Sequence, residues 1–598
     1  MQKEIKKRAS VYGVTAVLLA VILSALCYNL GVIPGFGPPI GPSPTPNPHP
    51  EFLSTFSSYD ELRNYLLKNS GTQGVFPYYG PSDVRILGPD VVSPAESTPG
   101  LKLYSTTNVQ VAGVDEADIV KTDGEYIYLV SGSSVYILKA YPPEEAEVLS
   151  NITFGDDLYP IGVFVDSTSH RLAVLGSKYE PWTFPSWSYS GYYCVDIKTF
   201  ANIYDISDKE NPASLMNFTI TGSYFSSRMI GDYIYFVASQ PTYIIYDTVV
   251  LPKIYLNNAM KEIGPSEIHY ANVSDNYYQY TTIVALNTQN ITEVPTEYTI
   301  MLGGTSSMYV SLSNIYITFP ESYEQTSIYR IRIENSTIYS AAHGMVNGHE
   351  LNQFSMDEYS DYFRIATTTW MNKNNLYVLD MNLSQVGNLT DFAPPGETMD
   401  SARFIGNRCY LSTSTPRKDP FFVIDVENAS EPKILGNLSI PGFTRYLHPY
   451  DDDHVIGIGI DGGNVKITLF DVSDVSAPIN MSEYKFSGVW SDTSALTEHK
   501  AFLFDKLKEL LVIPVSIKFD SYSVSSWQGA CVFNITLENG LVLKGNVTHL
   551  ESGMNGYEYA YWVNRALYIN DTLYTLSDKK IMMNSLEDLL LINEISFP

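Results

Sequence analysis

Cysteine and charge are both scarce in this chain of 598 residues. Only four cysteines occur: Cys27 lies in an N-terminal apolar stretch, and Cys194, Cys409 and Cys531 each stand alone. The spacing predicts neither a disulfide framework nor a paired-cysteine metal site, and core thiols are the favoured interpretation. Charged residues make up 17% of the chain, against roughly 25% in typical soluble domains. The net charge of −28 argues against nucleic acid or anionic membrane surfaces as main partners.

The familiar sequence motifs of enzymes are missing as well. No Gly-x-Ser-x-Gly, Walker loop, His-Glu-x-x-His or dinucleotide fingerprint occurs, and the nine histidines show no ligand spacing. The six tryptophans do not fall one per repeat unit, which disfavours a quinone-cofactor dehydrogenase. We therefore predict no cofactor. A paired-carboxylate glycosidase stays open, because such a pair need not be close in sequence.

What the chain does contain is an internal repeat with a period of about 45 to 50 residues, from about Ala117 to Pro598. Each unit holds four short runs of alternating apolar residues. Its clearest marker is an aspartate followed seven residues later by a proline, at Asp205 and Pro212, Asp425 and Pro432, and Asp471 and Pro478. Aspartate can start a turn by bonding its own backbone, and proline cannot donate into a strand ladder. The marker therefore predicts a strand end and a turn.

A second repeat aligns residues 226–235 with residues 401–410, where Gly-Asp and Gly-Asn indicate a tight hairpin. Four short strands per unit, repeated at this period, are typical of propeller blades. The sequence thus predicts an all-β fold, a β-propeller of about eight to nine four-stranded blades, with a short N-terminal membrane or signal helix. Nine units are counted, and a blade shared by both chain ends would make the ring eight.

The N-terminal region has a different composition. Lysines and an arginine precede an apolar stretch, which predicts a signal peptide or, preferably, a retained signal anchor whose downstream part faces outward. A proline-rich spacer then follows, which is stiff and extended. The predicted organisation is a signal peptide or signal-anchor helix (1–33), a linker (34–50), a short helix with an irregular lead-in (51–100) and the propeller (101–598).

Thirteen Asn-x-Ser/Thr sequons indicate a glycosylated, exported protein. They mark Asn151, Asn217, Asn272, Asn290, Asn335, Asn382, Asn388, Asn428, Asn437, Asn480, Asn534, Asn546 and Asn570.

Four motifs resemble those of a family of secreted archaeal and bacterial β-propeller proteins, distantly related to WD repeats. The motifs are Thr107–Gly124, Leu351–Tyr359, Tyr446–Tyr450 and His499–Asp505. The similarity runs from about Phe52 to the end of the chain. The resemblance implies a propeller fold and export. It transfers no catalytic residue, since the family has no established activity. Glu498 departs from the family by standing where an aspartate is common.

Several polar residues are candidates for a site at the propeller hub. Arg228 and Arg403 hold equivalent repeat positions, and Asp357, His448 and His499 align with them more loosely. Together they could line a polar pocket, or they could form salt bridges between blades.

An acidic cluster follows in the family motif, at Asp115, Glu116, Asp118 and Asp123. Oxygen ligands of this kind could hold Ca²⁺, although the order of a calcium loop is missing. A solvated turn or hydrogen bonding between blades is the favoured interpretation.

Three insertions interrupt the repeat and are rich in aromatic residues, at 179–193, 239–281 and 518–528. They are either binding loops or packed against the ring. The predicted function is an extracellular, envelope-tethered binding or scaffold module of unknown ligand, a monomeric propeller held at the membrane by its N-terminal segment. Its expected partner is a cell-envelope protein or glycan. The alternative is an extracellular polysaccharide hydrolase or lyase with carboxylates in the hub, so enzymatic activity stays open.

Overall fold

The computed structural model describes residues 53–69, 103–183, 193–245, 247–271, 278–414, 419–520, 526–554 and 556–598. The predicted signal or anchor helix, the linker, most of the irregular lead-in and Asn272 lie outside these residues, as do the central parts of the 179–193 and 518–528 insertions.

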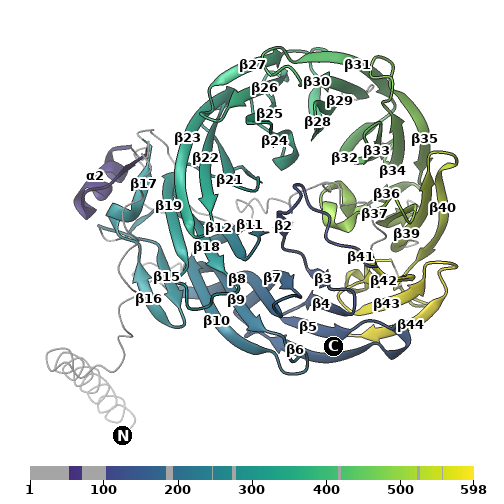
Figure 1. Cartoon of the computed structure of the whole chain (residues 1–598), viewed down its shortest axis with the longest axis horizontal. Coiled ribbons are helices and arrows are strands. Elements are labelled where there is room, and N and C mark those ends of the chain that lie inside the picture. The colour runs from purple at the N-terminus through teal and green to yellow at the C-terminus, as the bar shows by residue number, and fades with distance from the viewer. Residues whose placement is uncertain are drawn as a thin grey trace, which may run out of the picture.

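The described chain forms a closed ring of nine sheets of four or more strands, which confirms the predicted all-β propeller and its nine units (Figure 1). We number the sheets as blades in chain order. Blade 1 contains β3 (Val120–Thr122), β4 (Tyr126–Ser131), β5 (Ser134–Lys139) and β6 (Glu147–Thr153). Blade 2 contains β7 (Leu158–Asp166), β8 (Arg171–Thr183), β9 (Tyr193–Asp205) and β10 (Ala213–Thr221). Blade 3 contains β11 (Ser223–Ile230), β12 (Tyr233–Pro241), β18 (Gln279–Asn287) and β19 (Thr296–Leu302). Blade 4 contains β20 (Ser307–Val310), β21 (Asn314–Pro320), β22 (Gln325–Glu334) and β23 (Thr337–Asn347). Blade 5 contains β24 (Met356–Tyr359), β25 (Tyr362–Thr368), β26 (Asn374–Asp380) and β27 (Gln385–Thr390). Blade 6 contains β28 (Thr398–Ile405), β29 (Arg408–Ser414), β30 (Asp419–Asp425) and β31 (Lys433–Ile440).

Blades 7 to 9 complete the ring. Blade 7 contains β32 (Phe443–Asp451), β33 (His454–Asp461), β34 (Asn464–Asp471) and β35 (Ile479–Lys485). Blade 8 contains β36 (Trp490–Asp492) and β37 (Leu503–Asp505), both paired with β38 (Leu510–Lys518), then β39 (Ser526–Thr536) and β40 (Gly540–Val547). Blade 9 contains β41 (Arg565–Ile569), β42 (Thr572–Leu576), β43 (Lys580–Ser585) and β44 (Leu591–Ser596). All four strands of blade 9 come from the C-terminal segment, so the two chain ends do not share a blade and the ring counts nine.

Apolar packing between neighbouring blades holds the ring together. Nine buried clusters each span one pair of successive blades. The cluster that closes the ring joins Ile127 and Leu129 of blade 1 to Leu567 and Tyr574 of blade 9. Full burial of such a side chain contributes roughly 1.5–3 kcal/mol. Each sheet is therefore covered on both faces, and this packing supports closure of the ring.

The antiparallel order of each blade separates two ends of the ring. Connections from the first to the second strand and from the third to the fourth leave one end, which we call the turn end. Connections from the second to the third strand, and from one blade to the next, leave the other end, which we call the loop end. The insertions 179–193, 239–281 and 518–528 each join a second strand to a third, so all three leave the loop end.

The repeated aspartate acts in a turn at the turn end, as predicted. Its Oδ1 accepts a hydrogen bond from the backbone N–H two residues on, at 2.8 Å for Asp205 and 2.9 Å for both Asp425 and Asp471. The turn also packs against the preceding blade. A Cβ added to Gly436 on β31 would lie 2.2 Å from the carbonyl oxygen of Val475, so only glycine permits this close approach.

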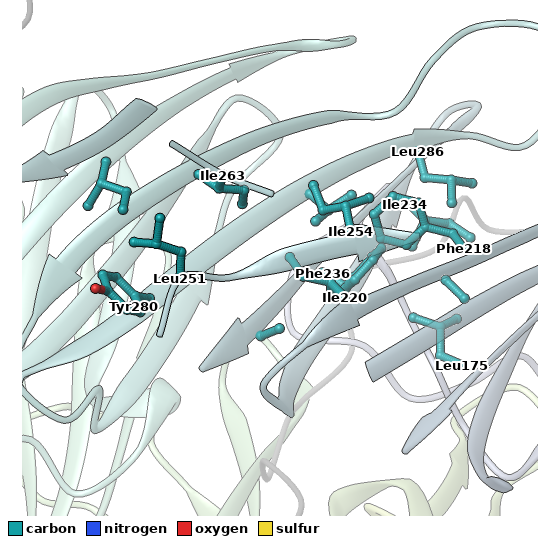
Figure 2. Close-up of a cluster of buried hydrophobic side chains, with 14 of the residues drawn as sticks. Leu175, Phe218, Ile220, Ile234, Phe236, Leu251, Ile254, Ile263, Tyr280 and Leu286 are labelled. Carbon is teal, nitrogen blue, oxygen red and sulfur yellow. The ribbon is translucent and has the colours of Figure 1, made fainter. Parts of the chain in front are cut away.

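The described part of the 239–281 insertion is packed against the ring rather than projecting from it. β15 (Lys253–Leu256) and β16 (Ala259–Glu262) extend blade 2, while β17 (Ile268–Tyr270) and β1 (Ser54–Thr55) extend blade 3; β13 (Ile244–Ile245) and β14 (Thr248–Val249) form a separate hairpin. Figure 2 shows Leu251, Ile254 and Ile263 in the same buried cluster as Phe218 and Ile220 of blade 2. The loop-packing interpretation therefore holds for this stretch.

The lead-in helix α2 (Tyr59–Asn69) lies beside this insertion at the outer rim (Figure 1). The Tyr59 hydroxyl accepts a hydrogen bond from the Val249 N–H at 2.5 Å. Phe56 stacks on Tyr270 with ring centroids 4.0 Å apart. The insertion thus fixes the N-terminal segment to the ring. Among the described residues there are also six short 3-10 helices: η1 (Pro143–Glu145), η2 (Pro265–Glu267), η3 (Gln353–Ser355), η4 (Ser494–Leu496), η5 (His499–Ala501) and η6 (Tyr559–Tyr561).

Candidate functional site

Residues 103–118, which we call the hub segment, cross the centre of the ring before the first blade begins. Tyr104 forms a bridge with Ile569 of blade 9, and the Ser105 N–H donates to the Tyr568 carbonyl at 2.9 Å. Further on, β2 (Asp115–Glu116) pairs with β11 of blade 3. Figure 1 shows β2 near the middle of the ring. The hub segment therefore links blades at different points of the circle.

Amide side chains fix the middle of the hub segment to two short 3-10 helices. Asn108 Nδ2 donates to the carbonyl of His499 at 3.1 Å and to the hydroxyl of Tyr446 at 3.2 Å. Gln110 Nε2 donates to the carbonyl of Gln353 at 3.1 Å. These contacts connect the hub segment to η3 and η5, which lie in the connections before blade 5 and within blade 8.

The acidic cluster of the hub segment is engaged in ion pairs. Asp115 Oδ1 lies 2.6 Å from Lys121 Nζ, and Asp118 Oδ1 lies 3.0 Å from Arg565 Nε. Glu116, which is buried, lies 3.6 Å from Arg228 Nε. Within the described residues no group of His, Cys, Asp and Glu side chains has the arrangement of a metal site. The geometry favours bonding between blades over the calcium interpretation.

Asp123, the fourth member of the cluster, lies in the turn between β3 and β4. Its Oδ1 accepts a hydrogen bond from the Tyr126 N–H at 2.8 Å, and its Oδ2 accepts one from the Tyr128 hydroxyl at 2.9 Å. This carboxylate therefore has a structural role in its turn.

The strand register shows that three of the hub candidates are equivalent. Arg228, Arg403 and His448 are each the third paired residue after a β-bulge in the first strand of their blade. Arg228 Nη2 donates to Gln353 Oε1 at 2.8 Å, and the Arg403 guanidinium lies 5.2 Å from the centre of the Phe354 ring. Both arginines thus contact η3, and both are buried.

The two hub histidines are fully buried. A hydrogen bond of 2.9 Å joins His448 Nδ1 to the Tyr446 hydroxyl, and the ring packs 4.5 Å from that of Phe502. Burial, with help from nearby Arg403, lowers the pKa of His448 well below its usual range, so the imidazole is neutral. His499 Nε2 lies 3.5 Å from Glu116 Oε2.

Asp357 is placed differently from the other candidates. Its Oδ2 accepts a hydrogen bond from Arg364 Nε at 2.9 Å, and Arg364 also donates to the Gly406 carbonyl of blade 6 at 2.7 Å. The structure therefore brings Arg228 and His499 together around Glu116, places Arg403 and His448 beside them, and gives Asp357 a partner of its own.

A cleft of about 230 Å³ lies between the hub segment and the inner strands. Its walls include Asp115, Asp118, Lys121, Lys500 and Arg565. Asp115 and Asp118 in this wall are each paired with a cation, and Asp123, which also lines the cleft, is bonded within its turn. Asp115 and Asp118 therefore have structural partners in the hub.

Aromatic side chains at the loop end form a second group, which the sequence did not single out. Of the ten exposed Tyr, Trp and Phe side chains among the described residues, eight lie at the loop end and two, Tyr141 and Tyr359, at the turn end. The eight are Tyr159, Tyr179, Tyr323, Trp370, Trp490, Phe519, Tyr557 and Tyr559. Only Tyr179 and Phe519 belong to the predicted insertions. The other six lie in connections or at strand ends, and no sequence signal marked their exposure.

Comparison with known proteins places the chain in a family. The model of the Beta propeller domain family matches residues 104–589. The chain belongs to this family. An uncharacterized protein of Methanocaldococcus jannaschii is 28% identical over 90% of this chain and 91% of its own length. An uncharacterized protein of Archaeoglobus fulgidus is also 28% identical, over 88% of this chain and 92% of its own length.

Solved propellers resemble the chain only in fold. A putative 6-phosphogluconolactonase from Bacteroides uniformis is 12% identical with a TM-score of 0.32, covering 55% of this chain and 97% of its own. A periplasmic gluconolactonase from Pseudomonas aeruginosa is 8% identical with a TM-score of 0.33, covering 53% and 91%. Among the described residues, no helix is long and apolar enough to cross a membrane.

Proposed function

We propose that the protein is an extracellular, envelope-tethered β-propeller that acts as a binding or scaffold module and recognises its partner at the loop end. The partner that fits this role is a cell-envelope protein or glycan. The observation that carries the proposal is the gathering of eight of the ten exposed aromatic side chains at that end.

Exposed aromatic groups at one end of a rigid ring are a typical recognition surface. Tyr and Trp are enriched at interfaces because each combines a large apolar face with a polar tip. Leaving such groups in water has no benefit for folding, and clusters of them mark interaction sites. The hub, by contrast, is crossed by the hub segment and its ion pairs, so the loop end is the better candidate for a partner.

The positions of the sequons support the loop end as the recognition surface. Among the twelve described sequon asparagines, six lie on fourth strands and six at the turn end. On fourth strands are Asn151, Asn217, Asn388, Asn437, Asn480 and Asn546; at the turn end are Asn290, Asn335, Asn382, Asn428, Asn534 and Asn570. Glycans attached at these positions would cover the outer wall and the turn end and leave the loop end bare.

The N-terminal sequence supports the proposed tether to the envelope. Basic residues, an apolar stretch and a proline-rich spacer precede α2, which docks at the outer rim. An anchor and stalk entering at the rim would leave both ends of the ring clear of the attachment point.

Binding of the purified full-length chain to envelope preparations of its own source cells tests the proposal. A loop-end variant would carry Tyr323→Ser, Trp370→Ser, Trp490→Ser and Tyr559→Ser. A control variant would carry Leu507→Ser and Leu590→Ser, which replace exposed apolar residues at the turn end. Co-sedimentation should weaken about tenfold or more in the loop-end variant, because exposed aromatics of this kind supply interface hot spots.

The control variant should bind as the wild type does. If both variants bind equally well, the loop end is not the recognition surface. If the wild type itself does not bind the envelope, the binding-module proposal fails.

A further inference from the structure

A pocket at the loop end lies between the second-to-third-strand connections of blades 4 and 5. The connection 321–324 joins β21 to β22, and the connection 369–373 joins β25 to β26, in neighbouring blades of the ring (Figure 1). The pocket has a volume of about 450 Å³. It is lined by Tyr323, His349, Thr368, Thr369, Trp370 and Asn372. Its size lies within the range of small-molecule sites, roughly 300–1,000 Å³.

Two aromatic rings form the rim of this pocket. Tyr323 is 83% exposed and Trp370 is 75% exposed. Their ring centroids are 6.2 Å apart with an interplanar angle of 62°, so the two faces enclose a corner instead of stacking on each other. Neither ring is buried in a core, and their geometry offers two apolar faces to one ligand.

The position of Trp370 is unusual for a turn. The Asn372 N–H donates to the Thr369 carbonyl at 2.9 Å, which closes a tight turn with Trp370 and Met371 at its tip. Asn372 has a φ of 56°, a left-handed conformation that asparagine tolerates. Turn tips ordinarily carry small or polar residues. A large indole displayed there is not required by the turn.

The floor of the pocket is rigid. The backbones of His349 and Thr368 exchange two hydrogen bonds of 2.9 Å. The imidazole adds a 2.9 Å hydrogen bond between Nδ1 and the Thr326 hydroxyl, and a 3.2 Å one between Nε2 and the Tyr323 carbonyl. His349 thus ties the two connections together. A preformed floor lowers the entropy that a ligand must lose.

Thr368, Thr369 and Asn372 contribute uncharged hydrogen-bonding side chains to the pocket. The Thr369 hydroxyl oxygen accepts from the Lys373 N–H at 3.2 Å, which leaves its own hydrogen available. Lys373 itself is paired with Asp391 at 3.0 Å and lies outside the lining. The exposed Glu324, in the same turn as Tyr323, adds a negative charge beside the pocket and disfavours anionic ligands.

We infer that this pocket is a subsite for a neutral six-membered sugar ring of a glycan. A pyranose presents an apolar C–H face to an aromatic ring and a rim of hydroxyls to side chains such as Thr369 and Asn372. The inference rests on the proposed function, since it names the ligand class for one part of the loop end. A proline-rich peptide also binds aromatic grooves, but it needs an extended groove, whereas this pocket is a corner backed by hydrogen-bonding groups.

Calorimetric titration of the full-length protein tests the subsite. The probes are maltohexaose, cellohexaose, xylohexaose and chitohexaose, with a proline decapeptide beside them. At least one hexasaccharide should bind the wild type. Trp370→Ala and Tyr323→Ala should each weaken that binding about tenfold or more, as expected when a central aromatic contact is removed.

Two further variants keep the result specific. Tyr323→Phe preserves the ring and should retain binding, as should Leu507→Ala, which removes an exposed apolar residue at the turn end. Circular dichroism and the Tm check that each variant is folded.

Three outcomes would overturn the subsite: binding of none of the four hexasaccharides, undiminished affinity in Trp370→Ala, or binding of the decapeptide alone. These results are distinguishable from failure of the proposed function. Envelope binding that the loop-end variant loses would still stand if every sugar probe failed.

Discussion

The hub and the loop end of this propeller use opposite kinds of side chain. In the hub, charged groups are buried against one another, as in the pairs of Asp118 with Arg565 and Glu116 with Arg228. At the loop end, uncharged aromatic rings such as Trp370 are displayed to water. Ionic groups that are buried and paired are a structural feature, while exposed aromatics have no structural task. The difference assigns ring closure to the hub and recognition to the loop end.

The largest expected effect comes from breaking a hub ion pair. Arg565 lies between Asp118 and Glu498, with Nη2 3.1 Å from Glu498 Oε2. Arg565→Met would leave buried Asp118 without its paired cation and remove one of the two cations beside Glu498. Breaking a buried pair in this way should cost about 3–5 kcal/mol in the free energy of unfolding. Thermal unfolding would report it as a large fall in Tm.

An exposed pair serves as the control for that variant. Lys433 lies 3.7 Å from Asp425 at the turn end, and its side chain is 64% exposed. Lys433→Met should cost less than about 1 kcal/mol, because solvent screens such pairs. Equal losses of unfolding free energy in the two variants would contradict a structural role for the buried hub charges.

Acid should produce the next largest effect, and it acts on the buried interior. His549 is buried and bonded to the Ser577 and Thr575 hydroxyls at 2.8 and 2.9 Å. Burial, with a smaller effect of Lys580, lowers its pKa to about 3 from 6.5. The unfolded chain therefore binds the proton more readily. The contribution of neutral His549 to the free energy of unfolding is fully present above pH 6.5. It is lost as the pH falls toward 3, at about 1.4 kcal/mol per pH unit.

Stability measured between pH 7 and pH 4 checks the sign. His549→Gln keeps a hydrogen-bonding group and should give a flatter pH dependence than the wild type. Identical slopes in the two proteins would show that His549 does not titrate with unfolding.

The smallest effect on stability is expected at the loop end. Trp490→Ser and Tyr559→Ser replace side chains that are 46% and 62% exposed. Each should change the free energy of unfolding by no more than about 0.5 kcal/mol, as for ordinary surface sites. A loss comparable to that of Arg565→Met would mean that these rings stabilise the fold, and the contrast between hub and loop end would disappear.

The fold could be predicted from the sequence because its signals are local. The aspartate marker, exemplified by Asp205, is turn chemistry within two residues. The equivalence of Arg228 and Arg403 followed from alignment of two hairpins, and the β-bulge register adds His448 to them. The common location of the three insertions at the loop end could also have been predicted, since each falls between the second and third runs of its unit.

The hub arrangement could not be predicted, because its contacts join distant parts of the chain. Asp118 and Arg565 are 447 residues apart in sequence. Nothing near either residue indicates the other. The aromatic character of the loop end was hidden for another reason: an isolated Trp370 between two strands carries no sequence signal of its exposure. The hub candidates Arg228, Asp357, Arg403, His448 and His499 stay predictions as functional residues, and the glycosylation sites stay predictions too.

Hydrogen exchange of the full-length protein, with and without its source-cell envelope preparation, tests the central claim most directly. Recognition at the loop end predicts that binding protects the connections 321–324 and 369–373 and the stretch 557–562, while the hub segment exchanges as slowly as before. Protection confined to the turn end, or a change confined to the hub segment, would contradict the account.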